Sequence, residues 1–187
     1  MRLPVVLAAA LALSVAAYGQ TVDLSGSASG GGGIVIATAG PVTLTGIVTE
    51  TNMVSLKIPA NTIGKNGLVE VRCLWANTNS ANNKTLSIRL SQTSGAVSGQ
   101  PGFQTVLTTT ATAQSLLAIG NSGATNAQLG FANGQLLLTP YGATTAGTVT
   151  GTVDTTADAW ININGVVAAA GETLTLQHAA LVIFPVP

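Results

Sequence analysis

The sequence predicts an all-β protein, an antiparallel β-sandwich of jelly-roll type, and three observations support that prediction. Apolar and polar residues alternate with a period of two through most of the chain after residue 33, as they do in strands with one buried face. Threonine outnumbers the six basic and six acidic residues together, and β-branched residues suit a pleated, half-buried surface. Asn-Gly pairs, which are typical of two-residue hairpin turns, separate several of the apolar runs.

The alternation is seen in three segments, 42–49, 54–58 and 85–90, where apolar residues alternate with threonine, serine, lysine or arginine. The apolar run 68–75 would place Val69, Val71, Cys73 and Trp75 on one face of a strand. Further strand-like runs are 103–109, 115–119, 135–139, 148–153, 159–163 and 172–184. Roughly eight to ten short strands over about 150 residues are typical of a jelly roll.

Turn signals divide these runs. Asn66-Gly67, Asn133-Gly134 and Asn164-Gly165 each lie between apolar residues and predict hairpin turns, while the polar segment 78–83 predicts a loop. The stretch 110–117 is the only weak helix candidate after residue 33.

The last predicted strand is apolar on both faces near its end. One face carries Ala179, Leu181 and Ile183, and the other carries Ala180, Val182 and Phe184. Both faces of such a strand need cover, which indicates either a central strand or a subunit interface.

The chain divides into an apolar leader (1–19), a flexible Gly/Ser linker (20–33) and the β-sandwich domain (34–187). Arg2, the apolar run that follows it and the small residues near Ala17 and Gly19 form the pattern of a secretory signal peptide. The alternative is a retained N-terminal arm that is buried in an assembly.

Charge is scarce, and the formal net charge is zero. A polar, uncharged surface lacks the repulsion that keeps monomers apart, so we expect the chain to associate with copies of itself or with a partner. The basic residues of the domain are few and all lie between Lys57 and Arg89. They are too few for a nucleic-acid footprint, so nucleic acid is not expected as a partner.

The residues that could support catalysis or metal binding are equally sparse. His178 is the only histidine, and Cys73 is the only cysteine and is expected to be a buried, inert thiol. Asp154 and Asp158 are the only close acidic pair, and they either flank a turn or contribute to a weak calcium site. We therefore expect no catalytic residues, no metal site, no cofactor and no enzymatic activity.

The two tryptophans, Trp75 and Trp160, lie in strand-like runs and are expected to pack in the core. Tyr141, in the segment 140–142, is the better candidate for a residue that contacts a ligand.

The segment 63–90 combines a Gly-Lys-Asn-Gly turn, a strand ending in Trp75, the run Thr-Asn-Ser-Ala-Asn at 78–82 and a Lys-Thr strand. With the closing run 172–176, it resembles the jelly-roll domains of tailed-phage virion proteins such as head-fibre, decoration and tail-fibre-like proteins. The resemblance is one of strands and turns, with no catalytic signature.

The resemblance implies a homo-oligomeric, often trimeric, structural protein of the virion that decorates a capsid or forms a fibre. Its partners would be other virion or capsid proteins and a host surface glycan or protein. The signal-like leader departs from this family, because a virion protein assembled in the cytoplasm needs no export signal. The alternative function is a secreted bacterial β-sandwich, acting as an adhesin or surface-binding module.

Overall fold

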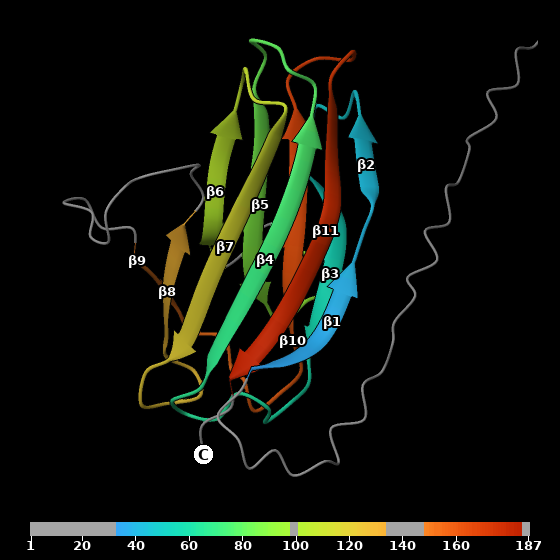
Figure 1. Ribbon diagram of the computed structural model, residues 1–187. Helices are drawn as coiled ribbons and strands as arrows, with labels where there is room; N and C mark the ends of the chain where they lie inside the picture. The colour runs from blue at the N-terminus through green and yellow to red at the C-terminus, as the bar shows by residue number, and fades with distance from the viewer. Residues whose placement is uncertain (1–32, 98–100, 134–147, 185–187) are drawn as a thin grey trace, which may run out of the picture.

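The structure is a computed structural model that describes residues 33–97, 101–133 and 148–184. These residues form two antiparallel sheets packed face to face, which confirms the predicted sandwich (Figure 1). The larger sheet contains β1 (Ile34–Ala39), β2 (Val42–Thr45), β4 (Leu68–Asn77), β7 (Thr112–Asn121), β8 (Gln128–Asn133), β9 (Thr148–Gly151) and β11 (Thr173–Phe184). The smaller sheet contains β3 (Thr51–Ile58), β5 (Lys84–Ser91), β6 (Pro101–Leu107) and β10 (Ala159–Val167).

The strand order is that of a jelly roll. The larger sheet runs β1-β11-β4-β7-β8-β9, with β2 also paired to β11, and the smaller sheet runs β3-β10-β5-β6. Strands β1 and β2 pair with successive parts of β11 and act as one interrupted strand. The chain then crosses between the sheets, and the hairpin-like addition of β8 and β9 widens the larger sheet beyond β7. The remaining strands give the two interlocked four-stranded sheets of the jelly roll.

The two-residue alternation of the sequence decides which side chains face the interior. In β4, Val69, Val71 and Cys73 are buried, while the residues between them face outward. Strand β11 keeps the same alternation on either side of a bulge between Leu176 and His178. The bulge shifts the register by one residue and so keeps the apolar set on the core side at both ends of a twelve-residue strand.

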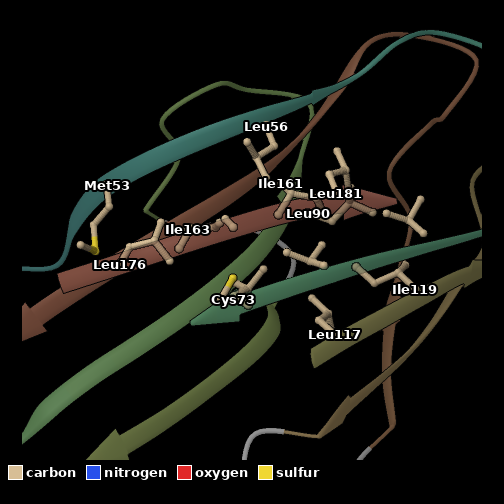
Figure 2. Close-up of a cluster of buried hydrophobic side chains, with 14 of the residues drawn as sticks. Met53, Leu56, Cys73, Leu90, Leu117, Ile119, Ile161, Ile163, Leu176 and Leu181 are labelled. Carbon is tan, nitrogen blue, oxygen red and sulfur yellow. The ribbon is translucent and has the colours of Figure 1, made fainter. Parts of the chain in front are cut away.

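The core lies between the two sheets and is mostly aliphatic. Figure 2 shows Leu56, Ile161 and Ile163 of the smaller sheet's side lying above Cys73, Leu117 and Ile119 of the larger sheet's side. Trp75 is its largest buried side chain, and its indole Nε1 donates a hydrogen bond to the Ser115 hydroxyl at 3.0 Å. Burial of this apolar area, at about 25 cal/mol per Å², is the main force that holds the sheets together.

Strand β11 is a central strand, since it lies between β1/β2 and β4. Its inward residues Ala179, Leu181 and Ile183 are buried. Its outward residues Ala180, Val182 and Phe184 are only half-buried. Pairing on both edges therefore accounts for the position of this strand but leaves its outer apolar face without a full cover among the described residues.

The predicted turn at Asn164-Gly165 is wrong, because β10 runs straight through it to Val167. Asn164 pairs with Ser87 of β5 on one side and Asn52 of β3 on the other. Gly165 serves packing instead: a Cβ there would lie 2.7 Å from Leu174 and 3.0 Å from Leu44. A small residue is needed where side chains from the opposite sheet approach the backbone.

Asn66-Gly67 is also not a hairpin turn. It belongs to the long connection 59–67 that carries the chain from β3 in the smaller sheet to β4 in the larger sheet. Gly67 is required there, since a Cβ would lie 1.8 Å from the carbonyl oxygen of Ile63. The weak helix candidate 110–117 is likewise wrong, because 112–117 form the first part of strand β7.

Two strands were not anticipated, β1 and β8. The predicted strand 135–139 lies outside the described residues, and so does Gly134 of the predicted Asn133-Gly134 turn. The leader (1–19) and the linker residues 20–32 also lie outside them.

Candidate functional site

The charged side chains of the described residues are mostly tied up in four separate ion pairs. They are Lys57–Asp158 at 2.7 Å, Arg72–Glu70 at 2.7 Å, Lys84–Glu172 at 3.3 Å and Arg89–Glu50 at 3.0 Å. The four pairs involve different strands and connections, and each of these carboxylates is matched with a basic side chain.

One of these pairs is buried and joins two connections at one end of the sandwich. Lys84 is fully buried and Glu172 is 5% exposed. The Glu172 carboxylate accepts hydrogen bonds from Asn82, Ser80 and Lys84. These bonds, from Asn82 first, then Ser80 and Lys84, hold the pKa of Glu172 below its ordinary value. The buried charges of Lys84 and Glu172 are both hydrogen-bonded, so the cluster stabilises the contact between the 78–83 loop and the start of β11.

The single cysteine is placed as a structural residue. Cys73 lies on the inner face of β4 with Val69, Val71 and Trp75, as the sequence predicted. Burial raises the pKa of its thiol to about 12, although a hydrogen bond with Ser115 acts in the opposite direction. A thiol that stays protonated at neutral pH is a poor nucleophile and a poor metal ligand.

His178 is exposed on the outer face of β11, next to the bulge and opposite Leu74 of β4. No group of three or more His, Cys, Asp or Glu side chains that could hold a metal ion occurs within 33–97, 101–133 and 148–184. The position of His178 therefore offers no metal cluster and no acid–base partner set among these residues.

Asp154 and Asp158 flank the turn that leads into β10, and each is engaged locally. The Asp154 carboxylate accepts hydrogen bonds from the hydroxyl and backbone N–H of Thr156, and these lower its pKa. Asp158 binds Lys57 and accepts a bond from the Ala60 N–H, and the Lys57 contact is the larger cause of its lowered pKa. Both arrangements stabilise the connections around the turn.

The outer face of the smaller sheet carries a buried polar ladder. Asn162 and Asn164 of β10 point away from the core, yet both are fully buried because the β5–β6 connection covers them. Asn162 accepts a hydrogen bond from the Gly95 N–H and donates to the Thr93 carbonyl, and Asn164 donates to the Ala96 carbonyl. Asn52 and Ser55 of β3 complete the ladder.

The sequence contains a signal for this ladder in the alternation of residues 160–164, although the Asn164-Gly165 pair also matches a turn. In the run 160–164, tryptophan and asparagine alternate with isoleucine, which places them on the face opposite the core. Trp160 is accordingly half-buried on the outer face, in register with Lys57 and Ser91, and its predicted place in the core is wrong. Trp75 is buried in the core, as predicted. Tyr141 lies outside the described residues.

The outer face of the larger sheet is different: it is apolar and open. Val35, Leu74 and Leu129 are 48%, 51% and 39% exposed. Half-buried apolar residues lie between them on the same side of the sheet, and the cross-strand pairs place all of them together. We call this set the outer apolar face; its members are Val35, Leu68, Leu74, Leu116, Ala118, Leu129, Ala180, Val182 and Phe184.

Figure 1 views the sandwich from this side, with β7, β4 and β11 in front of the smaller sheet. The Glu70–Arg72 ion pair lies in the middle of the face, on β4. The chain enters the domain at its edge, since a Cβ at Gly33 would lie 2.5 Å from the Phe184 ring and 2.6 Å from Val182. Contiguous exposed apolar surface of this kind marks an interaction site.

A scan against protein-family models finds no match, and a search of curated proteins finds none either. Among solved structures, the chain is similar to a lectin from Bauhinia forficata in complex with GalNAc, at 9% identity and a TM-score of 0.35. The alignment covers 76% of this chain and 86% of that one. A likeness at this level says nothing of what this chain binds. Of the described residues, none belongs to a helix long and apolar enough to cross a membrane.

Proposed function

We propose that the chain is a non-catalytic structural protein of a virus particle, a capsid-decorating or fibre-type jelly roll that works by associating with copies of itself and with other virion proteins. The observation that carries the proposal is the outer apolar face of the larger sheet. It is the part of the described surface where apolar side chains from β1, β4, β7, β8 and β11 meet without a covering layer.

The chemistry of the described residues supports a role without catalysis. The carboxylates are held in ion pairs or turn contacts, the thiol is buried, and the one histidine stands apart from them. The scarcity of charge favours association, because little electrostatic repulsion opposes contact between copies. A host surface glycan or protein is a further partner that this proposal allows.

The alternative is a secreted bacterial adhesin or surface-binding module. Two observations favour it: the signal-like leader, and Trp160 half-buried on the smaller sheet beside the Lys57–Asp158 pair. An aromatic ring with polar neighbours is a common way to bind a sugar or a protein surface.

The location of the natural product and its N-terminal residue distinguish the virion proposal from the adhesin alternative. The gene is expressed from Met1 in its own host, and fractions are probed with an antibody against residues 34–187. The virion proposal expects the antigen to co-sediment with assembled particles and to retain Met1. Export of a product cleaved near Ala17 or Gly19, with none on particles, would favour the adhesin.

A further inference from the structure

We propose that the outer apolar face packs against the same face of a second copy of this chain, around a two-fold axis that crosses β4 at the level of Val71. This inference rests on the self-association in the proposed function and names its surface. It also replaces the three-fold symmetry that the virion resemblance implies with a two-fold contact.

The apolar character of the face is the first argument. Along β11, β4 and β7 its outward positions are Ala180, Val182 and Phe184, then Leu68 and Leu74, then Leu116 and Ala118. Leu74 is half exposed at 51%, although it lies on a central strand, where no edge effect accounts for its exposure. A layer over this face would remove that apolar surface from water at about 25 cal/mol per Å².

Charge complementarity is the second argument, and it sets the symmetry. Glu70 and Arg72 are the charged residues of the face, two positions apart on β4, and the Arg72 side chain is 64% exposed. A two-fold axis in the plane of the interface, perpendicular to the strands at Val71, places Glu70 of each copy opposite Arg72 of the other. The same operation places Leu68 opposite Leu74 of the second copy and Leu116 opposite Ala118. On β11 it brings Phe184 over the exposed His178, and each of the two charges on β4 meets its opposite.

The remaining exposed apolar residues argue against a ring. Val48, Val97 and Val106 lie on the β2–β3 connection, the β5–β6 connection and the edge strand β6. Within 33–97, 101–133 and 148–184 they do not form a second patch complementary to the outer apolar face. A three-fold ring needs two different surfaces that fit each other, whereas a two-fold contact needs only one that fits itself.

The size of the face predicts a dissociable contact. It spans five strands, about 19 Å between the first and last strand axes at a spacing of about 4.8 Å. It covers residues 68–74 of β4, about 20 Å at a rise of about 3.4 Å per residue. The footprint is therefore about 400 Å², half of the roughly 800 Å² per partner of a standard stable interface. We expect the dimer to form and dissociate within the micromolar concentration range.

Sedimentation equilibrium of the full-length chain over a concentration series tests the proposal. Five proteins are compared: the wild type, Leu74→Lys, Glu70→Arg, the charge-swapped Glu70→Arg/Arg72→Glu, and the control Val48→Lys. Val48 is 61% exposed and lies outside the outer apolar face. Circular dichroism and the denaturant midpoint of each variant confirm that it is folded.

The proposal expects a monomer–dimer equilibrium for the wild type. Leu74→Lys and Glu70→Arg should weaken the dimer tenfold or more, and the charge-swapped double variant should recover most of the loss. Val48→Lys should leave the mass unchanged. The control and the recovery separate a specific contact from a general effect of added charge.

Three other outcomes would refute this inference, and they differ in whether the proposed self-association is refuted as well. A trimer, or any oligomer whose mass does not respond to Leu74→Lys, would refute this face while the proposed self-association survives. A wild type that stays monomeric at all concentrations would refute both, and it would indicate that a segment of the chain outside the described residues covers the face. Failure of the charge swap to recover the dimer would refute the two-fold register.

Discussion

Replacing Ser115 by alanine tests the hydrogen bond that anchors the largest core side chain. Trp75 and Ser115 are 2% and 3% exposed, so water does not reach the indole N–H if the hydroxyl is removed. A buried donor without a partner costs about 1–3 kcal/mol, more than the net value of the hydrogen bond itself. The Ser115 hydroxyl also bonds the Cys73 thiol, which adds a smaller loss.

The expected effect of Ser115→Ala is a fall of about 1–3 kcal/mol in the free energy of unfolding. With a urea m-value of about 2 kcal/mol per M, the midpoint should fall by roughly 0.5–1.5 M at an unchanged slope. Urea unfolding followed by Trp fluorescence and circular dichroism measures both quantities.

A double-mutant cycle then checks the cause. In a Trp75→Phe background the indole donor is absent, so Ser115→Ala should lose most of its effect. If Ser115→Ala costs as much in Trp75→Phe as in the wild type, the unsatisfied indole is not the source of the loss and the reasoning is refuted.

Three further predictions follow from buried or engaged groups. Burial raises the pKa of the Cys73 thiol to about 12, so Cys73 should not react with a maleimide at pH 8 in the folded protein and should react fully in denaturant. Mass spectrometry measures the labelled fraction. Fast labelling of the folded protein would contradict the burial of Cys73. Asp154, Asp158 and Glu172 have folded-state pKa values below their ordinary ones, so their stabilisation is fully present above the unfolded-state values near 3.8–4.5 and is lost as the pH falls through the folded-state values. The urea midpoint should therefore be flat from about pH 7 to 5 and fall below about pH 4.5, and a midpoint that rises on acidification would contradict this sign. Gly67→Ala should prevent folding or lower the free energy of unfolding by more than about 4 kcal/mol, because its Cβ would overlap the Ile63 carbonyl. Gly171→Ala is the control and should be tolerated, since no atom lies within 4 Å of a Cβ there. Equal urea midpoints for the two variants would contradict the close approach at Gly67.

Much of the fold was predictable because one rule, alternation with a buried face, holds across most of the strands. It places Val69, Val71 and Cys73 of β4 toward the core without any knowledge of the partner strand. A strand-like run alone does not say which face a residue occupies, and the prediction that Trp160 packs in the core was wrong for that reason. Alternation places Trp160 on the outer face, beside Asn162. The two-residue alternation is the stronger signal when a polar residue lies on the same face of the strand as the aromatic residue.

The misassigned turns have a different cause. Asn-Gly is a strong local turn signal, but a glycine is also needed where atoms from elsewhere in the fold come close. Gly165 meets Leu174 from the opposite sheet, and Gly67 meets the Ile63 carbonyl. Neither approach can be read from neighbouring residues, because both depend on how the sheets pack.

The candidate site was predictable only in part. The sequence showed that the final strand is apolar on both faces and that charge is scarce. It could not show that Val182 and Phe184 share a surface with Leu74 and Leu129, since these residues are joined by pairings across the whole chain. The pairing of Lys84 with Glu172 was hidden for the same reason.

The most direct test of the account measures how accessible the outer apolar face is as the protein concentration rises. A single thiol is introduced by Leu74→Cys or, as control, by Val48→Cys, in a chain whose own Cys73 is buried. The account predicts that maleimide labelling at position 74 slows several-fold between low and high micromolar protein, while labelling at position 48 keeps a constant rate. A labelling rate at position 74 that does not depend on concentration, or that falls together with the rate at position 48, would contradict it.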